Sequence, residues 1–264
     1  MELDRYIPRH SPAHRADARL KIVLAIAGVL GIALLPSGAF VAYALVWLTL
    51  VAASAFARLG PLRLVRGSWV VLPFVLVALP LLFTRPGEPV LTLELGPVVL
   101  TITDTGLRDT LSIAAKSWLS VQAALLLAYT TPFAALVDAL RALRVPAIIV
   151  STISFMYRYL AVLVDEAARM NRARRSRSAA APSGRSGGSV TWRARVTGAM
   201  VGSLFIRSYE RSERIYAAML ARGFSGTIRA TELSRPDQRS LTLTALALVA
   251  LAAFVVVVNL WTLR

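Results

Sequence analysis

The sequence contains no cysteine, and among its 264 residues there are only two lysines and two histidines. Without cysteine the chain can form no disulfide, thiolate metal site or thiol nucleophile. His10 and His14 are separated by Pro12, which interrupts the helix that would align them, and no acidic cluster accompanies them. We therefore expect solvated histidines in this segment and no metal site.

Two catalytic signatures are also missing. The sequence has no GxxxxGK[ST] loop for ATP phosphates, and the glycines of residues 183–188 (SGRSGG) lack the flanking strand and the lysine. No nucleophile-elbow motif provides a serine nucleophile. We therefore predict that the chain is not an enzyme, has no catalytic residues and needs no cofactor of its own.

What the sequence does contain is apolar and basic. It is 56% hydrophobic, its mean hydropathy is +0.63, and its formal net charge is +16. Apolar spans joined by arginine-rich cytoplasmic loops produce both properties at once, which predicts an all-α polytopic membrane protein. No small-residue cleavage pattern closes the first apolar run, so we expect that run to be retained as a span. Five segments approach the roughly 20 apolar residues that a bilayer requires: Leu20 to Pro36, Phe40 to Phe56, Trp69 to Phe83, Leu107 to Phe133 and Leu241 to Trp261.

The charges of the loops predict the orientation. Arg58, Arg63 and Arg66 lie between the second and third spans with no acid among them, whereas residues 85–109 carry four acids against two arginines. The positive-inside bias then places the first loop and the N-terminus in the cytoplasm. We expect the protein to lie in the inner membrane of a bacterial cell. Residues 89–103 hold two β-branched, leucine-rich runs on either side of Gly96 and Pro97, which predicts a small extracytoplasmic β-hairpin.

A strongly basic block lies between the fourth and fifth spans. Residues 134–239 contain eighteen arginines against seven acids, which predicts a cytoplasmic module of one short amphipathic helix and two long helices. The apolar stretch from Ala147 to Val164 is expected at the membrane interface, because a full span would bury Arg158 in the bilayer. The composition of residues 178–190 predicts a flexible linker. The domain boundaries are thus 1–133, 134–239 and 240–264.

The two long helices carry a repeated pattern at their ends. Shifting the sequence by 45 residues aligns Arg169 with Arg214 and Arg177 with Arg222. In each helix the two arginines are eight residues apart, which places them about 12 Å apart along the axis. Gly223 offers the left-handed conformation that ends a helix, and the helix dipole favours the cation just before it.

Three functions could use this arginine block. Anionic lipid headgroups attract basic residues in general. Nucleic acid is not expected, because aromatic residues are few and the block is tethered at a membrane. Docking of a dimeric protein partner explains what charge alone does not, namely two matched helix ends. A membrane-bound enzyme that holds an anionic substrate on this surface is a further alternative, although no acid, base or metal constellation accompanies it.

Four segments of the chain, residues 3–21, 132–146, 156–178 and 207–226, make it resemble a known family. It is similar to the transmembrane T component of energy-coupling factor transporters, of the cobalt or nickel type known as the CbiQ family. The resemblance implies that two cytosolic ABC ATPases drive import and that the T component transmits their movement to a separate membrane subunit that binds the substrate.

The resemblance also assigns residues. Ala221, Arg222 and Gly223 match the second Ala-Arg-Gly coupling motif of the family. The first motif is occupied by Ser176, Arg177 and Ser178, a mild departure, so that Arg174 or Arg175 is an alternative to Arg177 for the first ATPase contact. The cargo implied is cobalt or nickel, bound by the partner subunit, and a vitamin-binding subunit remains the alternative.

Overall fold

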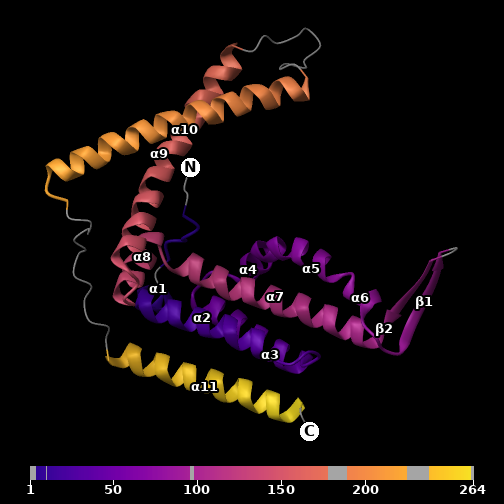
Figure 1. Ribbon diagram of the computed structural model, residues 1–264. Coiled ribbons are helices and arrows are strands. Elements are labelled where there is room, and N and C mark those ends of the chain that lie inside the picture. Colours follow the sequence, from indigo (N-terminus) through magenta and orange to yellow (C-terminus); the bar gives the residue numbers. More distant parts are fainter. Residues whose placement is uncertain (1–3, 10, 96–97, 178–188, 225–237, 263–264) are drawn as a thin grey trace. The chain divides into compact units, whose positions relative to one another are not determined.

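The computed structural model describes residues 4–9, 11–95, 98–177, 189–224 and 238–262. These residues are mostly helical and include one two-stranded sheet (Figure 1), which confirms the predicted all-α class with a small hairpin. The chain divides into two compact units. The first comprises residues 1–139 and 234–264, and the second comprises residues 140–233.

Helices occupy all five predicted spans in the first unit. They are α2 (Ala18–Leu34), α3 (Phe40–Phe56), a broken helical segment from Pro61 to Thr84, α7 (Asp104–Thr130) and α11 (Gln238–Thr262).

Length and composition identify which helices can cross a bilayer. Among the described residues, four helical stretches are long and apolar enough: Pro61–Thr84, Asp104–Thr130, Ala147–Arg177 and Gln238–Thr262. The 17-residue helix α3 is apolar but shorter, and it rises about 26 Å against a hydrocarbon core of about 30 Å. Ala147–Arg177 meets the same criteria, so the interfacial position of its first half stays a prediction.

The third span begins earlier than predicted. Helix α4 (Pro61–Gly67) precedes the 3₁₀ turn Ser68–Val71, which leads into α5 (Leu72–Ala78) and α6 (Leu81–Thr84). The expectation that Arg63 and Arg66 lie in a loop is therefore wrong. Gly60, at φ +78°, turns the chain, and Pro61 fits the first helical position because the ring fixes φ and no N–H is needed there.

Helix α7 is the centre of the first unit. It contacts α2, α3, α4, α5 and α6, while α11 packs against α2 (Figure 1). Leu119 of α7 joins a buried cluster with Ile32 and Tyr43. Two to three turns further on, Leu125 and Tyr129 join a second cluster, which covers the end of α3 and the start of α4.

The amino-terminal segment is folded against the end of α7. The Ile7 N–H donates to Tyr129 O at 3.1 Å, and the Lys21 ammonium donates to Thr130 O at 3.2 Å. Asp4 accepts from the Phe133 N–H at 3.0 Å, which caps the start of α8 (Phe133–Ala142) from a distant part of the chain.

His14 takes part in the same packing. It lies in the short helix α1 (Pro12–Arg15), is only partly exposed, bonds Ser11 Oγ through Nδ1 at 2.7 Å and stands edge-on to the Tyr6 ring. The expectation of a solvated His14 is therefore wrong, because the segment packs on the span instead of extending into water. His10 lies outside the described residues.

The predicted hairpin is present. Strands β1 (Pro89–Leu95) and β2 (Val98–Thr103) pair antiparallel, with Leu91 opposite Ile102 and an irregularity next to Pro89. Thr103 then caps α7, since its hydroxyl accepts from the Gly106 N–H at 3.1 Å. Gly96 and Pro97 lie outside the described residues.

Two glycines of this unit provide a matched test of its packing. A Cβ at Gly67 would lie 2.7 Å from Tyr129 Oη and 2.8 Å from Leu125 Cδ1, whereas a Cβ at Gly28 would meet nothing within 4 Å. We predict that Gly67→Ala lowers stability by about 1 to 3 kcal/mol through overpacking, while Gly28→Ala is neutral or gains up to about 1 kcal/mol in helix propensity. Thermal unfolding midpoints in detergent measure both. Equal midpoints for the two variants would contradict the packing described for α4 against α7.

Candidate functional site

Two long helices form most of the second unit. Helix α9 (Ala147–Arg177) has 31 residues and α10 (Val190–Ala221) has 32. Ser189 caps the start of α10, because its side chain accepts a hydrogen bond from the Trp192 N–H. The two helices cross, and beyond the crossing their C-terminal ends point in different directions (Figure 1).

An ionic contact joins the helices where they cross. Glu166 of α9 accepts a hydrogen bond from Arg169 on its own helix, and the Arg207 guanidinium of α10 approaches its other oxygen at 3.4 Å. The Arg169 hydrogen bond, aided by the nearby charges of Arg207 and Arg211, lowers the pKa of Glu166 below its ordinary value. Glu166 therefore stays ionised and bridges the two helices. A cleft of about 170 Å³ lies here, lined by Leu163, Glu166, Leu204, Arg207, Ser208, Glu210, Arg211 and Arg214.

Helix α10 is covered along one narrow stripe. Most of its partly buried residues recur three or four apart, as expected for a single helix face: Val196, Met200, Leu204, Ser208, Arg211, Ile215 and Met219, with Ser203 next to Leu204. The other faces are largely exposed, with Phe205 at 70% and Tyr209 at 60%. Helix α10 thus presents most of its length, and its end, to whatever surrounds it.

The end of α10 is fixed by a complete Schellman turn. The Gly223 N–H donates to Leu220 O at 2.9 Å and the Phe224 N–H to Met219 O at 3.0 Å, with Gly223 at φ +79°. Arg222 is the C-cap residue, and its own N–H donates to Met219 O at 3.1 Å. The backbone that carries Arg222 is therefore held by three hydrogen bonds, while its side chain is exposed.

The same turn ends two other helices, but with arginine in the left-handed position. Arg58 (φ 56°) follows α3 and Arg144 (φ 62°) follows α8, with the matching bonds from Leu59 N–H to Ser54 O and from Val145 N–H to Leu140 O. A non-glycine residue pays a steric cost in this conformation. At the end of α10 the left-handed position is occupied by Gly223, which adopts it without this cost. Arg222 is one residue earlier and has an ordinary negative φ.

The first predicted motif lies at the end of α9. Arg175, Ser176 and Arg177 are exposed there, Arg174 is partly buried, and the Ser176 hydroxyl donates to Arg172 O at 3.1 Å. Arg177 is still within the helix, whereas Arg222 follows the last helical residue of α10. Ser178 lies outside the described residues, so the structure does not extend the comparison with Gly223.

The crossing divides each helix into two arms. Arg177 lies eleven residues beyond Glu166, or about 16 Å along α9, and Arg222 lies fifteen residues beyond Arg207, or about 22 Å along α10. The structure thus places both predicted arginines at the exposed ends of two helices that contact each other where they cross. The sequence prediction did not include Glu166 among the functional residues, although the acidic pair Asp165–Glu166 within an arginine-rich block was a signal for such a contact.

Apolar spans, a hairpin and a pair of long helices that end in arginines define a polytopic membrane protein with a second, helical unit. The chain belongs to the CbiQ family of cobalt transport proteins, because the model of that family matches residues 9–233. This range includes both predicted motifs and the crossing between them. The family is one of transporter membrane components and not of enzymes, so the alternative of a membrane-bound enzyme is set aside.

Three relatives show how far the similarity extends. The cobalt transport protein CbiQ of Rhodobacter capsulatus is 31% identical over 199 residues, which cover 74% of this chain and 75% of that protein. The energy-coupling factor transporter transmembrane protein EcfT of Heliobacterium modesticaldum is 28% identical over 236 residues, 85% of this chain and 84% of that protein. The uncharacterized protein MJ1571 of Methanocaldococcus jannaschii is 29% identical over 156 residues. These residues cover 58% of this chain and about half, 51%, of the Methanocaldococcus protein.

The turn at the end of α10 can be tested through its glycine. We predict that Gly223→Ala destabilises the turn by about 1 kcal/mol, because alanine is disfavoured at positive φ. Amide hydrogen exchange at residues 219–224 should then become faster. The matched variant Arg144→Gly relieves the same strain and should slow exchange at Val145. Unchanged exchange in both variants would show that these turns do not depend on the left-handed residue.

Proposed function

We propose that this protein transmits the ATP-driven motion of two cytosolic ABC ATPase subunits to a membrane subunit that binds the transported substrate. Family membership and the similarity to an energy-coupling factor transmembrane protein support this role. Arg222 would dock on one ATPase through the second motif, with Ala221 and Gly223, and Arg177 would dock on the other, with Ser176, Ser178 or Arg174 beside it.

The observation that carries the proposal is the construction of the α10 tip. Arg222 is exposed, yet its backbone is held by the Schellman turn and its helix is anchored at Glu166. A guanidinium presents five donors in a planar fork that suits carboxylates on a partner. A docking residue on a firmly held backbone can carry force, whereas one on a loose segment would move without displacing its helix.

The membrane arrangement we propose follows from the charges. Residues 1–133 and 240–264 form the membrane part and residues 134–239 the cytoplasmic coupling part, with the N-terminus in the cytoplasm of a bacterial cell and the protein in its inner membrane. The excess of arginine in residues 134–239 supports this orientation.

The coupling would be mechanical. When the ATPases bind ATP and close, the sites that hold the two tips would change their separation, and the arms would rotate about the contact between Glu166 and Arg207. The apolar first half of α9 would pass this rotation to the membrane, where the substrate-binding subunit would change its orientation as a rigid body.

The cargo we propose is cobalt or nickel, held by the partner subunit. The family description and the name of the Rhodobacter relative support cobalt. The Heliobacterium relative carries a name without a cargo, and its similarity favours the second candidate, a vitamin-binding subunit served by the same scaffold. Uptake of labelled cobalt and nickel with the neighbouring gene products distinguishes these candidates.

Charge reversal at the tips tests docking. We predict that the double variant Arg177→Glu and Arg222→Glu loses co-purification with ABC ATPases by at least about tenfold, because each reversed tip would repel the acidic partner site. Arg193→Glu, on an exposed residue at the other end of α10, makes the same charge change and should keep the ATPases bound. The single variant Arg174→Glu shows which arginine makes the first contact. Normal ATPase binding by the double variant would refute the docking role.

A charge swap at the crossing separates docking from transmission. We predict that Glu166→Arg lowers uptake several-fold while the ATPases remain bound, because it places a third cation beside Arg169 and Arg207 at the shared contact. The double variant Glu166→Arg and Arg207→Glu restores an opposite pair and should recover part of the uptake. If the single variant transported normally, the crossing would not be the pivot.

A further inference from the structure

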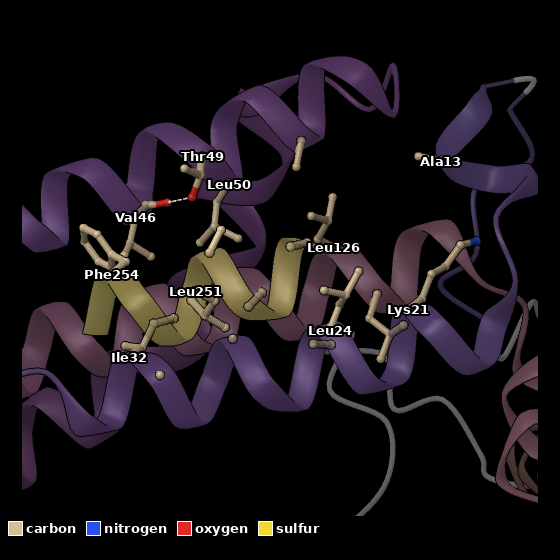
Figure 2. Close-up of a pocket in the computed structure, with 18 of the residues that line it drawn as sticks. Ala13, Lys21, Leu24, Ile32, Val46, Thr49, Leu50, Leu126, Leu251 and Phe254 are labelled. Carbon is tan, nitrogen blue, oxygen red and sulfur yellow. Dashed lines mark hydrogen bonds between the residues drawn. The ribbon is translucent and has the colours of Figure 1, made fainter. Parts of the chain in front are cut away.

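The first unit contains an apolar groove of about 740 Å³ among α2, α3, α7 and α11 (Figure 2). Its size is typical of sites that hold small ligands, roughly 300 to 1,000 Å³. Small residues leave the space open, and they include Ala25, Gly28, Ala53 and Ala250. The groove belongs to none of the features that the coupling role uses.

One end of the groove is cationic and the rest is apolar. Among the described residues that line it, Lys21 is the only charged one, and its side chain reaches the end next to Ala13 (Figure 2). Ile32, Val46 and Phe254 line the opposite part. The hydroxyls of Thr49 and Thr130 are turned to their own helices, where they donate to Val46 O and Leu126 O. The groove therefore has the polarity of an amphiphile with an anionic head.

Lys21 can serve such a head while keeping its structural contacts. Its ammonium has three donors, and two are directed at His14 O and Thr130 O, each at 3.2 Å. The nearby carboxylate of Asp17 is engaged by the Arg19 N–H at 2.9 Å and by the Arg19 side chain at 3.9 Å. A third ammonium donor can therefore be given to a phosphate at the mouth of the groove.

The length of the groove fits one lipid leaflet. From Lys21 to Leu35, both of which line it, the rise of α2 is about 21 Å. Half of the hydrocarbon core of a bilayer is about 15 Å. An acyl chain can lie along the groove from a headgroup at Lys21 without reaching its far end.

We propose that this groove binds one anionic phospholipid, with its phosphate at Lys21 and an acyl chain along α2 between α3 and α11. The apolar groove by itself gains little from holding an acyl chain, because the surrounding lipid is equally apolar. Selectivity therefore comes from the charge at Lys21, and the bound lipid would fill the space that small residues leave between the spans.

Gly28 offers a clean way to close the groove. It lines the cavity, and a Cβ built on it meets no atom within 4 Å. Gly28→Phe should therefore direct its ring into the space proposed for the acyl chain. Ile26→Phe is the matched control, since Ile26 is on the same helix, is 55% exposed and does not line the groove.

The experiment presents the full-length protein, without ATPases, with vesicles of equimolar phosphatidylglycerol and phosphatidylcholine, and counts retained lipids by native mass spectrometry. We expect about a fivefold preference for phosphatidylglycerol, the effect of one surface cation on an anionic lipid. Lys21→Met should abolish the preference for the lipid that Gly28→Phe displaces, and Lys21→Arg should keep it. Gly28→Phe should remove the retained lipid, and Ile26→Phe should not.

Each opposite result overturns the proposal. Equal retention of the two lipids by the unchanged protein would mean that the groove has no headgroup site. Retention of phosphatidylglycerol by Gly28→Phe would place the lipid elsewhere. The thermal midpoint of Lys21→Met shows whether this change loosens the amino-terminal segment. If it does, Lys21→Arg and Gly28→Phe still decide whether the groove binds the anionic lipid. No ATPase takes part, so failure of the coupling role leaves this result unaffected.

Discussion

The junction between α7 and α8 sets the constraint on which the membrane unit depends. The last carbonyls of α7 and the first N–H groups of α8 lack partners in their own helices. Next to a bilayer such groups cannot stay unpaired without a large cost. The amino-terminal segment supplies the partners: Ile7 and Lys21 donate to Tyr129 O and Thr130 O, and Asp4 accepts from the Phe133 N–H. The first residues of the chain thus fix how its central helix ends.

The same contacts explain why one lysine can serve two purposes. Lys21 must reach the carbonyl end of α7, which draws its side chain to one end of the apolar groove. A cation is favoured at a helix C-terminus by the dipole, and an ammonium keeps a donor to spare. The backbone carbonyls that accept from Lys21 offset the free-energy cost of placing its charge beside apolar spans, and an anionic headgroup would offset it further.

Much of the architecture could be predicted from the sequence, because its signals are local. Apolar length located the five helical segments, and the runs around Gly96 and Pro97 located the strands. The start of the third span was missed because Arg63 and Arg66 were weighed as loop charges, whereas Gly60 and Pro61 favour a helix start there. The packing of His14 was missed because it depends on Tyr6, Ile7 and Ser11 folding back on the spans, which no local pattern reveals.

The candidate site was predictable in its residues but not in its geometry. Arg177 and Arg222 stood out through a 45-residue repeat, and Gly223 through the known preference of helix ends. The repeat suggested two equal tips, yet Arg177 lies within its helix while Arg222 follows the end of its own. Only the structure revealed that one ion pair, between Glu166 and Arg207, joins the two arms.

Unequal arms have a mechanical consequence. If the helices turn about the contact at Glu166, the tip at Arg222, about 22 Å away, moves further than the tip at Arg177, about 16 Å away. If the proposed ATPases displaced both tips by the same distance, the arms would rotate by different angles. The long apolar half of α9 lies on the other side of the contact, so the shorter arm belongs to the helix that would lead into the membrane. The asymmetry between the two motifs would thus direct the larger rotation to α9.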